Sequence, residues 1–207
     1  MQVAPDFTMQ LPGDEAAARR WYVAPRTVLL IPNAHMLRMG ASSDPWPDAY
    51  VAFMADVARR LTAEGLTVRI LNHGGMDDTE VCARIAAQAG ALDIIDEADP
   101  LAIKGIIGAA GAVVCSRYHG CVSALAQAVP CLATSWSHKY GALYDEFGVR
   151  EWLVRDPAPA DASRTLLELL RSPESARARL RRAAEALAIR TAAMWRDVSQ
   201  ALGASRP

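Results

Sequence analysis

Short apolar segments alternate with longer amphipathic segments along most of this chain, and this alternation restricts the fold more than any other feature. The short segments have the aliphatic and β-branched character of buried strands, and they occupy residues 27–31, 66–71, 92–95, 112–115 and 130–134. Between them, apolar residues recur at helical spacing. Right-handed crossovers join strands that alternate with such helices into a parallel sheet. We therefore predict an α/β fold with a doubly wound, Rossmann-like parallel sheet.

The same patterns predict where the helices and the domain boundaries lie. The predicted helices occupy residues 48–63, 100–110, 160–170 and 173–201, with two more that run from the loops at 72–78 and 135–140 to about residues 89 and 147. Residues 27–155 then form the Rossmann-like domain, and the helices within residues 156–207 pack on it. Residues 1–26 are punctuated by proline and glycine, which is typical of a linker or of a remnant of a missing amino-terminal domain.

Composition limits the classes of function. The chain has 207 residues, is 52% hydrophobic, and carries 22 Lys and Arg against 23 Asp and Glu, which is enough for one sizeable core and gives no global reason to bind nucleic acid. The arginine-rich run at residues 177–182 lies on a helical pattern and predicts a solvated face. No signal-peptide pattern precedes the first strand, and the apolar stretch at 101–114 is too short to span a bilayer, so we expect a cytoplasmic protein.

The four cysteines indicate a reducing compartment. Cys82, Cys115, Cys121 and Cys131 have no C-x-x-C spacing, and each lies in an apolar stretch, where a free thiol packs as a small hydrophobe. Cys121 follows a histidine closely, which would suit a nucleophile beside a base, but its place within an apolar helix favours packing.

The segment at residues 113–126 is the strongest candidate for a binding site. An apolar strand leads into Ser116, Arg117, Tyr118, His119 and Gly120, and an apolar helix follows. In open parallel sheets ligands bind at the carboxyl ends of the strands, where a helix N-terminus offers backbone N–H groups to an anion. Taken singly, Arg117 would be a surface residue and His119 a helix cap, but together with Gly120 they favour an anion site.

All four histidines fall in loops that follow predicted strands. His35, His73, His119 and His138 should therefore gather at one edge of the sheet, which fits proton transfer or anion binding, although polar residues are common in any loop. The histidines lack the spacing of common metal sites, so we predict no metal. The phosphate-binding loops of ATPases and dinucleotide-binding domains are also missing from the sequence. The loop from Asn72 to Gly75 is either a weak anion cradle or a tight turn.

These residues resemble the polysaccharide pyruvyl transferase family. The likeness rests on the Ser-Arg-Tyr-His-Gly segment at 116–120, on the small-residue helix and the Ala-Val-Pro that follow it, and on the polar loop at 136–140, with Ala128 where the family more usually has glycine. Residues 31–33, 71–73 and 99–105 also resemble members that act in exopolysaccharide synthesis. The likeness covers about residues 5–154 and corresponds to the carboxyl-terminal half of the family. It implies the second of two Rossmann-like domains in a GT-B-like architecture.

The resemblance implies transfer of a pyruvyl group from phosphoenolpyruvate, as co-substrate, to a pair of sugar hydroxyls. Arg117 and His119 would be the catalytic residues, engaging the carboxylate and phosphate, with His119 also exchanging a proton. No metal or other cofactor is required. The further substrate-binding candidates are Ser116, Tyr118, Gly120, Asn33, His35, Asn72, His73, Gly74, Ser137, His138 and Lys139.

Two other hypotheses remain at this stage. The chain could be a truncated or split anion-binding module without activity of its own, which pairs with a separate amino-terminal subunit or with itself. It could also be half of a glycosyltransferase that binds a nucleotide sugar, since such enzymes use the same edge of the sheet. An exposed apolar strip, for which Trp46, Trp136 and Trp152 are candidates, would favour a split subunit, although each tryptophan is more typical of a core or a sugar-stacking position.

Overall fold

The sheet is parallel throughout and forms the centre of the domain. The computed structural model describes residues 4–38, 46–134 and 137–203. Within them, six strands are arranged in the order β3-β2-β1-β4-β5-β6. The strands are β1 (Thr27–Ile31), β2 (Thr67–Asn72), β3 (Ile94–Asp96), β4 (Ala112–Cys115), β5 (Cys131–Thr134) and β6 (Leu153–Val154). The predicted doubly wound α/β fold is therefore confirmed.

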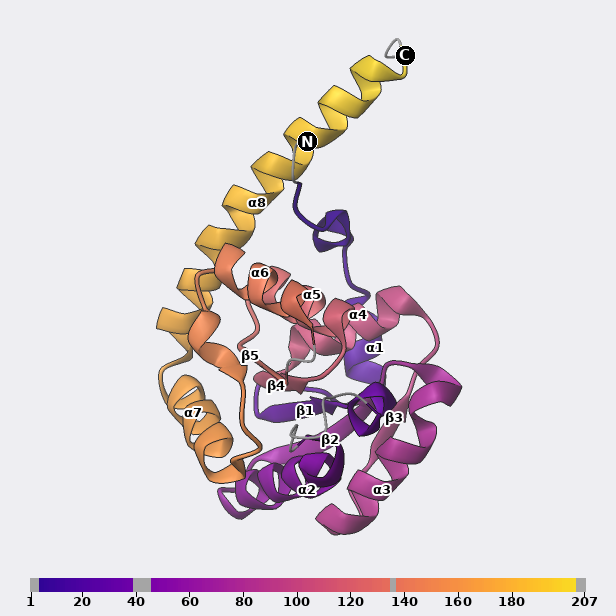
Figure 1. Ribbon diagram of the computed structural model, residues 1–207, viewed down its shortest axis with the longest axis vertical. Helices are drawn as coiled ribbons and strands as arrows, with labels where there is room; N and C mark the ends of the chain where they lie inside the picture. Colours follow the sequence, from indigo (N-terminus) through magenta and orange to yellow (C-terminus); the bar gives the residue numbers. More distant parts are fainter. Residues whose placement is uncertain (1–3, 39–45, 135–136, 204–207) are drawn as a thin grey trace.

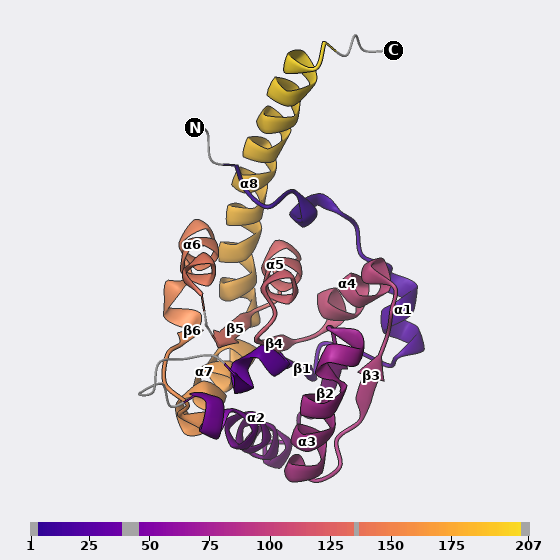
Figure 2. The same ribbon diagram turned by 45° about the vertical axis from the view of Figure 1, so that its right-hand side comes forward.

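Helices cover both faces of the sheet (Figures 1 and 2). On one face lie α2 (Trp46–Ala63), α3 (Thr79–Ala89) and α7 (Pro159–Arg171). On the other lie α4 (Pro100–Ala109), α5 (Tyr118–Ala126), α6 (His138–Glu146) and α8 (Pro173–Ala201). Every residue of the central strands β1, β4 and β5 is buried, as expected for a sheet covered on both sides.

Several element boundaries differ from the sequence prediction by one or two residues, and two of these differences have identifiable reasons. Strand β2 begins one residue later than predicted, because the N–H of Leu66 donates to the carbonyl of Leu61 and closes the end of α2. Strand β3 begins two residues later, because Gly90 and Ala91 both adopt left-handed backbone conformations after α3 and the chain is still turning there. Apolar character alone does not reveal such turns.

Residues before the first strand pack onto the domain. The 3-10 helix η1 (Phe7–Gln10) contacts α5 and α8, and the short helix α1 (Glu15–Arg20) packs on α4 with Ala17 fully buried. The segment expected to be a linker or remnant therefore contributes to the core. One and a half turns of helix are too short for a clear apolar period, which is why the sequence pattern did not reveal α1.

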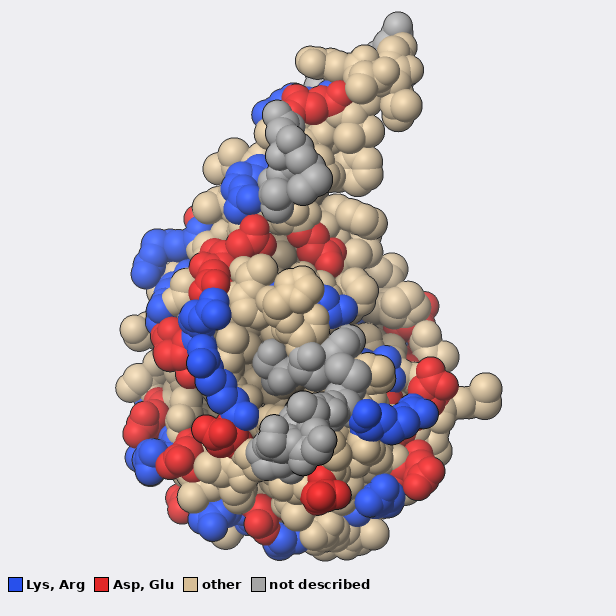
Figure 3. All heavy atoms as spheres, viewed as in Figure 1, with Lys and Arg blue, Asp and Glu red and all other residues tan. Residues whose placement is uncertain are grey.

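The carboxyl-terminal helices pack on the same domain. Helix α7 lies against α2, and the first part of α8 lies against α5. The far end of α8 extends beyond the sheet (Figure 2), where the ring of Trp195 meets the edge of Phe7 at a centroid distance of 5.9 Å. On the face drawn in Figure 3, positive and negative side chains are interspersed over the coloured residues, as the near-zero net charge suggests.

The buried residues settle several expectations about packing. Trp46 and Trp152 belong to the core, each with 5% of its surface exposed, so neither forms an apolar strip on the surface, and Trp136 lies outside the described residues. All four cysteines are buried free thiols. None of the described helices is both long and apolar enough to cross a bilayer.

Candidate functional site

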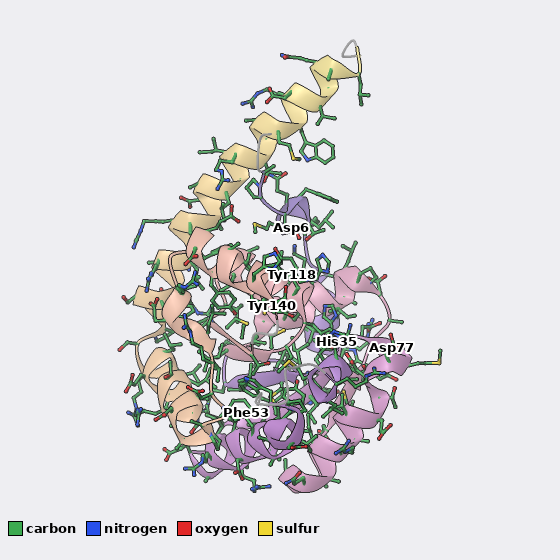
Figure 4. All side chains as sticks on the ribbon, in the orientation of Figure 1. Asp6, His35, Phe53, Asp77, Tyr118 and Tyr140 are labelled. Atoms are coloured by element: carbon green, nitrogen blue, oxygen red, sulfur yellow. The ribbon has the colours of Figure 1, made fainter. Side chains whose placement is uncertain are left out.

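The site lies where the winding of the sheet changes direction. Strands β1 and β4 are neighbours, and their last residues, Ile31 and Cys115, pair with each other. The chain leaves β1 toward one face and β4 toward the other, and ligands of open α/β sheets bind in the crevice that this divergence leaves. A hollow of about 340 Å³ lies here, lined by Asn33, Ala34, His35, Arg38, Asp77 and Arg117. Figure 4 shows His35 and Asp77 side by side at this edge.

Arg117, which lines the hollow, forms an ion pair with the buried residue Asp78. The Nε and Nη2 atoms of Arg117 donate to the two carboxylate oxygens of Asp78 at 2.7 and 2.6 Å. The Asp78 side chain is fully buried, whereas 27% of the Arg117 side chain is exposed. Burial by itself lowers the pKa of Arg117, but the bonds to Asp78 and its charge raise it above the ordinary value. The guanidinium therefore stays charged, and three of its five N–H groups have no hydrogen-bond partner among the residues that the structure describes.

Asp78 connects the loops that follow three different strands. Its Oδ1 also accepts a hydrogen bond of 2.9 Å from the backbone N–H of Ala34, in the β1 loop. Asp78 itself ends η3 (Gly75–Asp78) after β2, and Arg117 follows β4. A β-carbon at Gly74 would lie 2.2 Å from Asp78 Oδ2 and 2.3 Å from Arg117 Nη2. A larger residue at position 74 would therefore displace the ion pair.

The side chains of Ser116 and Asn33 form hydrogen bonds with other buried groups of the chain. The hydroxyl of Ser116 lies 2.5 Å from both the Tyr50 hydroxyl and the Thr134 hydroxyl. Its carbonyl accepts hydrogen bonds from Asn33 Nδ2 at 3.1 Å and from the Tyr140 hydroxyl at 2.8 Å. Ser116 and Asn33 are both buried, so the structure gives them a part in holding the β1 and β4 loops together.

Gly120 and Asn72 are likewise enclosed. A β-carbon at Gly120 would lie 2.6 Å from the sulfur of Cys115, so glycine allows α5 to pack closely on β4. Asn72 is 2% exposed, and its Nδ2 donates to Asp96 at 3.1 Å. Its Oδ1 has no hydrogen-bond partner among the described residues.

The histidines have three different environments. His35 is half-buried and lines the hollow. His73 is also half-buried, and burial, followed by the charges of Arg117 and His119, lowers its pKa to about 4, so it is neutral near pH 7. His119 lies in the first turn of α5 with 64% of its side chain exposed. His138, by contrast, begins α6 and lines a separate hollow with Ser137 and Arg150.

An aromatic group joins the starts of α5 and α6. The ring of Tyr118 meets Tyr140 edge to face at 5.6 Å and His119 at 5.5 Å. The Nζ of Lys139 lies over the Tyr118 ring, 4.7 Å from its centroid, which is a cation–π contact. Figure 4 shows Tyr118 and Tyr140 together beneath Asp6. The structure thus brings Lys139 to the beginning of α5.

Sequence reasoning missed Asp78, Tyr50, Arg38 and Asp6 as parts of this region. Asp77 and Asp78 are adjacent acidic residues, and nothing in the sequence distinguishes the exposed residue from the buried one. Among the described residues, no group of three His, Cys, Asp or Glu side chains could hold a metal ion.

A family model describes most of this region. The model for polysaccharide pyruvyl transferase matches residues 1–138, which include η1, strands β1 to β5 and every loop that lines the 340 Å³ hollow. Ala128, where glycine was the more usual residue in the resemblance, has a φ of 58°, a left-handed conformation that glycine adopts without strain. No curated protein matched the chain in a sequence comparison. Because the family model covers well over half of its residues, this chain belongs to the polysaccharide pyruvyl transferase family.

Proposed function

We propose that this chain is the donor-binding half of a pyruvyl transferase, which binds phosphoenolpyruvate and transfers its pyruvyl group to two hydroxyls of a sugar in exopolysaccharide synthesis. The observation that carries the proposal is the position of Arg117, which is held by buried Asp78 at the switch point of the sheet, with two of its five N–H groups bonded to Asp78. A planar guanidinium suits a carboxylate or a phosphate.

Other groups around Arg117 add to the attraction for an anion. Arg38 lines the same hollow, so a ligand with two anionic groups would meet two cations. Arg117 is the residue before α5, and its side chain makes no capping bond to the helix, so the positive end of α5 also faces this region. Phosphoenolpyruvate carries both a carboxylate and a phosphate, which matches this set.

The reaction needs one proton donor and one proton acceptor besides the anion site. Protonation of the methylene carbon makes the neighbouring carbon electrophilic, a sugar hydroxyl adds there and loses its proton, and a second hydroxyl replaces phosphate to close the ketal. The two hydroxyl protons end on the new methyl group and on the released phosphate. We assign the donor role to His119, while His73, whose pKa of about 4 makes it a weak base, stays a predicted substrate contact.

The remaining predicted contacts have different roles in this proposal. Ser116, Asn33 and Gly120 position the loops, while His35 contacts the ligand directly. Ser137, His138 and Lys139 stay predicted substrate contacts at the start of α6. Weaker substrate binding by His138→Ala would support this prediction. The groups that bind the acceptor sugar, and further catalytic groups, would belong to the amino-terminal half that the family implies.

Calorimetric titration with phosphoenolpyruvate tests the proposal. Arg117→Lys keeps the charge but loses the planar fork, and His119→Ala alters an exposed side chain, so both variants should fold. Binding by the wild type that weakens at least tenfold in Arg117→Lys and is unchanged in Arg164→Ala, an exposed arginine of α7 paired with Asp161, would support the proposal. A turnover assay with an added amino-terminal half would follow.

Two results would contradict it. Binding of a UDP-sugar without binding of phosphoenolpyruvate would favour half of a glycosyltransferase. Equal binding by the wild type and Arg117→Lys would show that the anion lies elsewhere.

A further inference from the structure

The segment before α1 is fixed across the start of α5. We call residues 5–14 the N-terminal strap. Asp6 caps η1, since its Oδ1 accepts hydrogen bonds from the N–H of Thr8 at 2.9 Å and from the Thr8 hydroxyl at 2.6 Å. The ammonium group of Lys104, a buried residue of α4, donates to the Thr8 carbonyl at 2.6 Å. These bonds fix the turn from Asp6 to Thr8 on α4.

A second set of contacts holds the strap against α8. The Nε2 of Gln10 donates to the carbonyl of Ala188 at 3.1 Å, and the ring of Phe7 meets Trp195. Figures 1 and 2 agree that the strap runs beside α8 before it reaches α1. These contacts fix the course of the strap along α8.

This arrangement places a carboxylate beside His119. Because Oδ1 of Asp6 is occupied by Thr8, Oδ2 is the oxygen that faces the imidazole, and it lies 3.7 Å from His119 Nε2. Only 17% of the Asp6 side chain is exposed. The charge of His119 also lowers the pKa of His73, in the loop that follows β2.

We propose that Asp6 is a positioning residue for His119. The carboxylate holds the Nε2 side of the ring, which leaves Nδ1 as the nitrogen that exchanges a proton with the ligand, and the N-terminal strap is thereby part of the site. A carboxylate that orients a histidine in this way fixes its direction without touching the reacting atoms. This inference rests on the proposed function, in which His119 meets phosphoenolpyruvate.

The sign of the effect distinguishes positioning from simple electrostatics. Asp6→Asn keeps an oxygen that can accept from Thr8, and it removes a negative charge from the neighbourhood of an anionic ligand. If Asp6 acted only through its charge, phosphoenolpyruvate would bind more tightly to the variant. If Asp6 positions His119, binding should weaken by about fivefold, near the upper limit for a partly exposed ion pair.

A double-mutant cycle with a matched control makes this test specific. Asp6→Asn should weaken phosphoenolpyruvate binding in the wild type but not in His119→Ala, because the group that Asp6 positions is then gone. Asp14→Asn is the control, since Asp14 caps α1 from the same segment through Ala16 and makes no ion pair with His119. Tighter binding by Asp6→Asn, or an equal loss in both backgrounds, would overturn the inference.

A ligand-free measurement separates this inference from the proposed function. Ring ¹³C relaxation of His119 should show a more ordered imidazole in the wild type than in Asp6→Asn, while His138, the other exposed histidine at a helix start, should be unchanged. If the wild type bound no phosphoenolpyruvate, the proposed function would fail, and this comparison would still decide whether Asp6 orders His119. An imidazole equally mobile in both proteins would overturn the inference.

Discussion

Replacement of Asp78 by asparagine is the most informative perturbation of the site. The carboxylate accepts bonds from Arg117 Nε, from Arg117 Nη2 and from the N–H of Ala34, and no part of its side chain reaches solvent. Asp78→Asn preserves the shape but supplies one oxygen where three donors converge. The new amide N–H₂ faces either the guanidinium or the backbone N–H, so at least one donor loses its acceptor.

The size of the effect follows from this geometry. Loss of one partner from a buried ion pair costs about 3 to 5 kcal/mol, because a charge is left without compensation. Arg117 is 27% exposed and can recover some hydration, which puts the expected loss in the free energy of unfolding at about 3 kcal/mol, the lower end of that range. For a chain of this length such a loss lowers the Tm by about 6 to 12 °C.

Urea unfolding, followed by circular dichroism, measures this loss directly. Asp161→Asn is the control, because Asp161 pairs with Arg164 on the surface of α7 and both side chains are more than half exposed. It should lose less than about 1 kcal/mol. Removing both partners, in Asp78→Asn with Arg117→Met, should cost less than the sum of the single changes, since neither charge is then left alone. A loss for Asp78→Asn as small as that for Asp161→Asn would refute the reasoning.

Three further predictions concern neighbouring positions. Gly74→Ala should lower the free energy of unfolding by about 2 kcal/mol in urea, since its β-carbon collides with both members of the ion pair, and a neutral result would contradict the observed spacing. Gly120→Ala should be destabilising in the same assay, and Cys115→Ala should restore part of the loss by removing the sulfur 2.6 Å from the new β-carbon. The pKa of His73 is about 4 in the folded protein and 6.5 in the unfolded chain. The free energy of unfolding should therefore fall as the pH falls from 6.5 through 4, because the unfolded chain binds the proton more tightly. In His73→Gln the free energy of unfolding should depend less on pH over this range. Identical profiles for the two proteins would exclude this role of His73.

Local patterns were sufficient for strands β1 to β5 and for the longer helices, but not for the short helix α1. Pro100 at the start of α4, after Asp99 whose Oδ1 accepts from two helix N–H groups, is a boundary signal that sequence alone carries. The same holds for α8, which spans the predicted residues 173–201. The start of a strand shifted where a backbone turn, as at Gly90 and Ala91, interrupts an apolar run.

The position of the candidate site could also be predicted, whereas the roles of its members could not. A parallel sheet brings the loops after its strands to one edge, so His35, His73 and Arg117 had to meet once the fold was known. Whether a polar side chain there faces a ligand or the core depends on its neighbours. Ser116 matches the family pattern, yet its hydroxyl is enclosed by Tyr50 and Thr134.

The sequence by itself determined the α/β fold, the edge of the sheet that carries the site and the family likeness, because helix and strand periods and a contiguous motif are local properties of the chain. Only the tertiary structure decided that Asp78 supports Arg117 from 39 positions away and that Asp6 reaches His119 from the first residues. The physical reason is that an acidic residue looks the same in sequence whether it is solvated or buried. Its partner is selected by the packing of distant elements, which supplies the desolvation that makes the pairing matter.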